Sequence, residues 1–80
     1  MRQLQSLSAY RAFEAAARHL SFKLAARELN VSPTAVSHQI RGLERQMGSQ
    51  LFDRKPRQVT LTANGVELFH SLKKAFDEIE

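Results

Sequence analysis

The sequence contains no cysteine, and only two prolines and three glycines interrupt its 80 residues. The absence of cysteine excludes a disulfide framework and a thiolate metal site, and it fits a reducing compartment. No apolar run approaches the roughly 20 residues that are needed to span a bilayer. Because no long apolar stretch follows the opening residues, Met1 to Gln5, we expect no signal peptide.

The sequence also has too few residues for more than one small domain. Hydrophobic residues make up 42% of it, which predicts a folded chain rather than a disordered one. A core of this size is too thin for most enzyme architectures with an enclosed pocket. The chain has no glycine-rich phosphate loop and no cluster of acid–base residues, and metal-ligand spacing is absent among its histidines, His19, His38 and His70. We therefore expect no enzyme activity, no metal and no cofactor.

Acidic residues are scarce before residue 62. Residues 1–61 carry ten basic and four acidic side chains, a net charge of +6, whereas residues 62–80 carry a net charge of −2. The positive charge of residues 1–61 suggests a polyanionic partner, with nucleic acid as the first candidate and a membrane surface as the second. Charge alone equally allows a solvated surface with surplus cations. A membrane-surface binder would need aromatic residues opposite its cations on one helix, and the acidic final segment argues against it.

Hydrophobic spacing and capping residues predict two helices before residue 31. The first covers Leu4 to about Arg18, a segment without glycine or proline. Ser21 caps the second helix, which stops at Asn30, a residue that tolerates the left-handed conformation of a helix end. One face of this second helix is apolar and consists of Phe22, Ala25, Ala26 and Leu29.

A third helix is predicted over residues 33–47, with Ser32 as its cap, Pro33 as its first residue and Gly48 as its end. At about 100° per residue, one side of this helix is apolar and consists of Val36, Ile40, Leu43 and Met47. The opposite side is polar at its start and cationic further along, and it consists of Thr34, Ser37, His38, Arg41 and Arg45. Gln39 lies at the edge of the apolar side, where we expect a structural role.

Two short strands are predicted over residues 51–54 and 58–61, on either side of a basic tip, Lys55-Pro56-Arg57. A proline suits the tip of a hairpin better than the centre of a strand. Thr62 then caps a last helix that runs to the end of the chain. The acids Glu28 and Glu44 are expected on the surface or in local ion pairs.

The last helix has two apolar rows. The first, which we expect to cover the chain's own core, consists of Val66, Phe69 and Phe76. The second has the alternating spacing of a coiled-coil seam and consists of Leu68, Leu72, Ala75 and Ile79. Since an exposed apolar strip needs a partner, the second row predicts a homodimer. The roles of the two rows could also be swapped or shared.

The second and third helices, joined by a short turn, have the pattern of a helix-turn-helix. The major groove of B-DNA is about 12 Å wide and admits one α-helix. Small polar groups at the start of that helix let its backbone approach the DNA, and longer cations further along can contact guanine or the flanking strand. The predicted DNA contacts of the third helix are therefore Ser32, Pro33, Thr34, Ser37, His38 and Arg41. An inert helical hairpin is the alternative.

Further DNA contacts are predicted outside the third helix. Ser21 is a helix cap first and can also donate to a phosphate, and Lys23 follows it in the first turn of the second helix. The basic hairpin is placed to contact an adjacent minor groove, where narrow stretches attract arginine, through Arg54, Lys55 and Arg57. A winged helix that binds protein is a rival interpretation. Such a protein would have no need of cations on both the third helix and the hairpin tip.

The residues of these segments carry a family resemblance. The pattern runs over Ser21-Phe22-x-x-Ala25-Ala26-x-x-Leu29-x-Val31-Ser32-Pro33-x-Ala35-Val36-Ser37-His38-Gln39-Ile40-x-x-Leu43-Glu44. It continues over Gly48-x-x-Leu51-Phe52-x-Arg54 and Leu61-Thr62-x-x-Gly65. Together these motifs resemble the N-terminal domain of the LysR-type transcriptional regulators, most of all the branch with the glycine-cleavage activator and the β-lactamase regulator. Lys23 and Asn64 depart from the family pattern, which usually has a small polar residue and an acid there.

The resemblance implies a mainly α fold, a winged helix-turn-helix with a two-stranded wing and a long C-terminal linker helix. It implies a DNA-binding domain over 1–61, with the helix-turn-helix at about 22–41 and the wing at about 51–61, and a linker and dimerisation helix over 62–80. It further implies antiparallel pairing of that helix in a homodimer on double-stranded promoter DNA, and no membrane partner. A C-terminal effector domain for a small molecule, absent from this chain, would complete a cytoplasmic bacterial regulator, with higher oligomers expected of the full-length protein.

Overall fold

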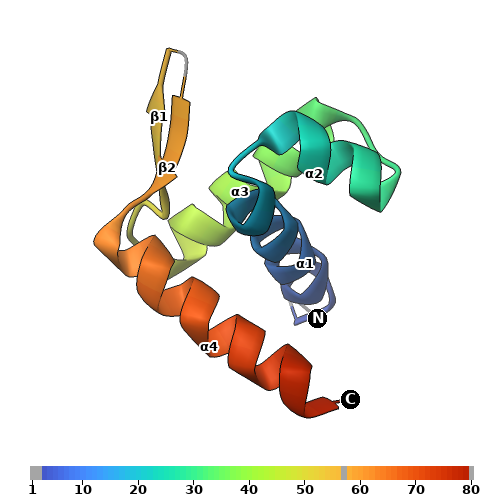
Figure 1. Ribbon diagram of the computed structural model, residues 1–80, viewed down its shortest axis with the longest axis vertical. Coiled ribbons are helices and arrows are strands. Elements are labelled where there is room, and N and C mark those ends of the chain that lie inside the picture. The colour runs from blue at the N-terminus through green and yellow to red at the C-terminus, as the bar shows by residue number, and fades with distance from the viewer. Residues whose placement is uncertain (1–2, 57, 80) are drawn as a thin grey trace.

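The computed structural model describes residues 3–56 and 58–79, with side chains from Leu7 to Ala75 within them. The fold is mainly α-helical, as predicted, with one two-stranded antiparallel sheet. Figure 1 shows the two strands as a hairpin that projects away from the helices. In chain order the elements are α1 (Gln3–His19), α2 (Phe22–Leu29), α3 (Pro33–Met47), β1 (Phe52–Lys55), β2 (Gln58–Leu61) and α4 (Ala63–Ile79).

The bounds of α2 and α3 follow from local capping, and both predictions are confirmed. The hydroxyl oxygens of Ser21 and Ser32 each accept a hydrogen bond of 3.0 Å from the backbone amide three residues on. Asn30 ends α2 at φ 64° and Gly48 ends α3 at φ 70°. Both residues therefore adopt the left-handed conformation in which asparagine and glycine are favoured.

The core lies where α1 packs against α2, α3 and α4. Small side chains bring the helices together, because α1 buries a series of alanines and α2 buries Ala25 and Ala26. The largest fully buried side chains are Phe13, Phe52, Ile40, Leu43, Leu51 and Val36. Met47, predicted on the apolar side of α3, is instead 44% exposed. It lies in the last turn of α3, beside the exposed C-cap Gly48.

The wing pairs β1 with β2 in a register that sets Phe52 opposite Leu61 and Lys55 opposite Gln58. The second strand has the predicted bounds, whereas the first begins one residue later than predicted. The reason is that the Leu51 amide donates to the Glu44 carboxylate and not to Thr62, the residue opposite it in this register, although the Leu51 carbonyl still accepts from the Thr62 amide. Leu51 thus anchors the base of the wing to its neighbours.

The start of α4 is fixed to the base of the wing. Thr62 caps the helix as predicted, because its Oγ1 accepts a hydrogen bond of 3.0 Å from the Gly65 amide. The same hydroxyl donates to the Gln50 carbonyl oxygen over 2.7 Å. One side chain therefore caps α4 and holds it against the segment that leads into β1.

The expected division of the α4 rows is wrong for Val66, and the alternative in which the two rows share the core fits the structure. Val66, expected to cover the core, is 42% exposed. Leu68 and Leu72, expected to face a partner, pack half-buried against the chain's own core beside Phe69. Because α4 lies against α1 and the wing, its core-facing side includes residues of both rows, and Ala75 is left exposed. Of the residues in the two rows, Phe76 and Ile79 have side chains outside the part of the chain that the structure describes.

An ion-pair network joins α1 to α2 on the surface. The Arg18 guanidinium lies 2.8 Å from both Glu14 and Glu28 carboxylates, and His19 Nε2 lies 2.7 Å from Glu28. Hydrogen bonds from Arg18, and then from His19, lower the pKa of Glu28 to about 2. Glu28 is therefore a surface ion-pair residue, as predicted, and exposed pairs of this kind add less than about 1 kcal/mol.

Candidate nucleic-acid interface

The polar face of α3 is open to solvent. Thr34, His38, Arg41 and Arg45 are exposed, Ser37 is half-buried, and Pro33 and the cap Ser32 are exposed at the N-terminal end. The opposite face is closed, because Val36, Ile40 and Leu43 are buried in the core. The predicted division of α3 is confirmed in these residues. The helix thus presents small polar groups at its start and two arginines further along.

The N-terminal end of α2 supplies a second polar surface. Lys23 is exposed in the first turn, and Ser21, half-buried, directs its hydroxyl to the Leu24 amide as a cap. The turn between the helices is held by a hydrogen bond of 3.0 Å from the Val31 amide to the Ala26 carbonyl. This turn fixes how the exposed start of α3 lies relative to α2.

The wing presents its predicted cations in different ways. Lys55 has 60% of its side chain exposed and lies 3.4 Å from the Asp53 carboxylate. Arg54 is only 24% exposed, with its Nη2 3.2 Å from Glu44 Oε1 and its guanidinium carbon 5.4 Å from the centre of the Phe22 ring. Arg57 lies outside the described residues. Of the two described cations, therefore, only Lys55 projects into solvent.

Glu44 is the residue that sequence analysis misplaced most. It was expected on the surface or in a local pair, but it is only 9% exposed. Its Oε2 accepts hydrogen bonds of 2.8 Å and 3.2 Å from the Leu51 and Phe52 amides, and its Oε1 pairs with Arg54. A signal was present: Glu44 follows Val36 and Ile40 at intervals of four residues, which places it along the buried side of α3.

An open hollow of about 770 Å³ separates the second half of α3 from the wing. Arg41 and Arg45 of α3 line one part of it, and Asp53 and Arg54 of β1 line another. The loop between them contributes Gly48, Ser49 and Gln50. Glu44 lines the hollow as well, so three arginines and two acids border it where α3 and the wing meet.

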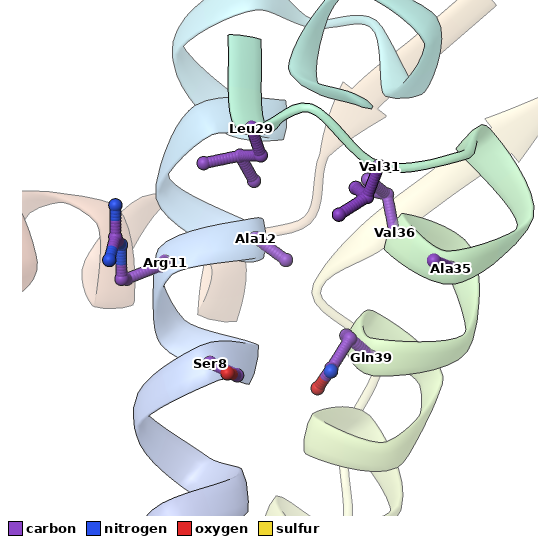
Figure 2. A pocket seen from close by; sticks show the side chains of 8 residues that line it. All are labelled: Ser8, Arg11, Ala12, Leu29, Val31, Ala35, Val36 and Gln39. Carbon is purple, nitrogen blue, oxygen red and sulfur yellow. The ribbon is translucent and has the colours of Figure 1, made fainter. Parts of the chain in front are cut away.

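A second, smaller hollow lies between α1 and the start of α3 (Figure 2). Its volume is about 220 Å³, below the range of about 300–1,000 Å³ typical of small-molecule sites. Figure 2 shows Arg11 pointing away from Val31 and Gln39, so its charge does not enter the hollow. Gln39, expected in a structural role, is half-buried here. We assign this hollow no ligand.

The described residues, 3–56 and 58–79, contain no group of three or more metal-ligating side chains. Within the same residues, no helix has both the length and the apolar character to cross a membrane.

A short turn joins α2 to α3, whose polar face is exposed, and a two-stranded wing follows. This arrangement defines a winged helix-turn-helix. Residues 7–66 match the family model described as bacterial regulatory helix-turn-helix protein, lysR family. The chain belongs to this family, as the sequence motifs predicted, and its fold is the family's helix-turn-helix DNA-binding domain.

The relatives of known sequence are transcriptional regulators. The chain is 55% identical over 74 residues to the HTH-type transcriptional activator AmpR of Providencia stuartii, covering 92% of this chain and 25% of that protein. It is 47% identical over 78 residues to the glycine cleavage system transcriptional activator of Escherichia coli K12, covering 98% of this chain and 26% of that protein. The chain thus spans about a quarter of the length of these relatives.

Solved structures with the same fold include complexes with DNA. The BenM_DBD/catB site 1 DNA complex matches with a TM-score of 0.85 and 32% identity, covering 91% of this chain and 81% of that one. The CbnR_DBD–DNA complex matches with a TM-score of 0.82 and 26% identity, covering 90% of this chain and 83% of that one.

Proposed function

We propose that this chain binds double-stranded promoter DNA sequence-specifically, as the DNA-binding domain of a bacterial LysR-type transcriptional regulator. The observation that carries the proposal is the exposed polar and cationic face of α3, opposite a closed apolar face. A helix with one such face can lie in a major groove while its other face stays in the core. Complexes with DNA among the structural neighbours support it.

In this proposal α3 lies in the major groove with its N-terminal end towards the bases. Ser32, Pro33 and Thr34 allow a close approach of the backbone, and Ser37 and His38 contact base edges. Arg41, one turn further on, contacts guanine or the flanking strand, as arginine commonly does in the major groove. Ser37 and His38 are adjacent on α3, where neighbouring side chains point about 100° apart, which does not suit a nucleophile–base pair. We therefore propose a binding role without enzymatic chemistry.

In this proposal a second surface of the protein contacts the DNA backbone. Lys23 and the N-terminal end of α2 face a phosphate, because a helix N-terminus carries partial positive charge and free amides. The exposed Lys55 and its neighbour Arg57 contact the backbone or minor groove beside the α3 site. Backbone contacts position a protein on DNA, whereas base contacts specify the sequence. Ser21 contributes through its cap and, in this proposal, through a phosphate contact.

We also propose the assembly that the family implies for this chain. Residues 1–61 are the DNA-binding unit, and residues 62–80 form the linker helix through which two chains pair. A two-fold dimer binds two half-sites about one helical turn apart, or a multiple of it. An effector domain beyond this segment, binding a small molecule, and a cytoplasmic location complete the proposal. The length of the relatives, about four times that of this chain, supports a further domain.

The test of DNA binding is the selection of bound duplexes from a random library with this 80-residue chain, followed by titration of the selected duplex at several salt concentrations. We expect log Kd to depend linearly on log salt, with a slope of about 0.9 per neutralised phosphate. Lys23→Met or Lys55→Met, each of which removes one positive charge, should reduce that slope by about 0.9 for each protomer bound. Selection of no sequence, or an affinity independent of salt, would overturn the proposal.

Specificity gives a separate prediction. Replacing Ser37, His38 or Arg41 by alanine should alter the preferred base at one or two positions and cost about 1–3 kcal/mol at the correct site. Thermal unfolding should barely change for His38 and Arg41, whose side chains are exposed. The control is Glu67→Ala, at an exposed position on α4, which should change neither the preferred bases nor the melting temperature. A sharp loss of melting temperature with an unchanged base preference would show that these side chains do not contact DNA.

A further inference from the structure

The Glu44 carboxylate joins α3 to the wing at three points. Its Oε2 lies 2.8 Å from the Leu51 amide and 3.2 Å from the Phe52 amide, at the base of β1. Its Oε1 lies 3.2 Å from Nη2 of Arg54, two residues further along the same strand. Because Glu44 itself lies on α3, these bonds fix β1 relative to the helix that presents Arg41 and Arg45.

Arg54 completes the connection on the side of α2. Its guanidinium carbon lies 5.4 Å from the centre of the Phe22 ring, and the Phe22 ring meets Phe52 edge-on at 5.2 Å. The Arg54 Nε is buried and has no hydrogen-bond partner in the described part of the chain. A cation over an aromatic face is held by the ring's negative charge distribution. The guanidinium is therefore oriented towards the protein by an anion and a ring together.

From this geometry we propose that Glu44 and Arg54 are positioning residues, which hold the wing in register with α3 so that both contact DNA as one rigid unit. Arg54 is then not a cation for a phosphate, because its charge is already compensated by Glu44. This changes the role that sequence analysis gave to Arg54. The inference rests on the proposed function and leaves the backbone contacts of the wing to Lys55 and Arg57.

The first test compares Arg54→Met with Lys55→Met, a neighbouring cation that is exposed. Methionine keeps much of the length of the arginine stem over Phe22 and removes only the charged group. On a random-sequence duplex, the salt slope of Arg54→Met should equal that of the unchanged chain, whereas Lys55→Met should lower it by about 0.9 per protomer. A fall of about 0.9 for Arg54→Met overturns the proposal.

The second test is a double-mutant cycle on the selected duplex. If Arg54 acts only through Glu44, then Glu44→Gln combined with Arg54→Met should bind no more weakly than the weaker single variant. Coupling of 0.5–3 kcal/mol, typical of paired residues, corresponds to a departure of about 2-fold to 150-fold from the product of the two single effects. Purely multiplicative effects overturn the proposal. In both single variants the wing should keep its backbone contact through Lys55 but no longer be held at one place, so hydroxyl-radical protection should weaken over the wing's minor groove and be kept beside α3, whereas simple destabilisation would weaken both together.

The third test needs no DNA and separates this inference from the proposed function. In Glu44→Ala, amide hydrogen exchange at Leu51 and Phe52 should become at least about tenfold faster, because each loses its side-chain acceptor. Glu67→Ala, at an exposed position on α4, is the matched control. Unchanged exchange at both amides overturns the positioning role. If the unchanged chain binds no DNA, the proposed function fails, and these exchange rates alone decide whether Glu44 fixes the wing.

Discussion

Replacing Gly65 by alanine is expected to lower the free energy of unfolding by about 3 kcal/mol, at the upper end of the usual cost of overpacking. A Cβ built on Gly65 would overlap the carbonyl oxygen of Leu51, and it would lie 3.0 Å from Leu61 Cδ2. The carbonyl belongs to the backbone, so it cannot swing aside as a flexible side chain does. For a domain of this size, the melting temperature should fall by roughly 12–24 °C.

The matched control is Gly42→Ala on α3, where the nearest atom to an added Cβ is Arg45 Nη2 at 3.9 Å. Alanine there fills open space in a helix and should raise the free energy of unfolding by roughly 0.5–1 kcal/mol. Thermal and urea unfolding of both variants measure the difference. A Gly65→Ala protein as stable as the unchanged chain would show that α4 does not need its close approach to Leu51.

The contact at Gly65 matters because it lies where α3, the wing and α4 meet. Leu51 accepts from the Thr62 amide with its carbonyl and donates to Glu44 with its amide. The base of the wing is thus bonded to α3 on one side and to α4 on the other. A change at Gly65 would therefore disturb the wing and the linker helix together.

Local rules predicted much of this fold. The bounds of α2 and α3 depend on caps that act over three or four residues, so Ser21, Ser32, Asn30 and Gly48 were sufficient. The exposed side of α3 follows from helical periodicity in the same way. These features need no knowledge of which element packs against which.

Features that depend on contacts between distant segments were not predicted. Glu44 was expected on the surface or in a local ion pair, because the amides that donate to it, those of Leu51 and Phe52, come near it only after the wing folds back onto α3. For the same reason Arg54 could be recognised as a cation of the hairpin but not as the partner of Glu44. The later start of β1 has the same origin, because the Leu51 amide donates to Glu44 and not to the opposite strand.

Periodicity alone could not assign the roles of the two α4 rows. Spacing identified both rows, but it could not fix which side of α4 would lie against α1. Leu68 and Leu72 pack half-buried on the core while Val66 is exposed. A seam between two chains would therefore use the remaining exposed parts of these leucines together with Ala75. The proposed homodimer and the chain's own core share residues of α4.

Leu72→Glu is expected to give a monomer whose affinity for the selected duplex falls by roughly 10²- to 10⁴-fold, because binding at one half-site no longer assists binding at the other. The introduced carboxylate would enter the proposed seam, where burial of an unpaired charge is unfavourable. Since Leu72 also packs on its own core, this variant should lose stability as a monomer too. Sedimentation measures the assembly, and thermal unfolding measures the loss of stability.

Two further variants separate the seam from the core. Ala75→Glu places the same charge on an exposed residue of the predicted seam, so it should dissociate the dimer while changing monomer stability by no more than about 0.5 kcal/mol. His70→Glu adds a carboxylate at an exposed position that lies about 160° from Leu72 around the helix, and it should leave the dimer intact. If Leu72→Glu and Ala75→Glu both still sediment as dimers, the seam lies elsewhere. If His70→Glu dissociates them as well, the added charge rather than the predicted face controls pairing.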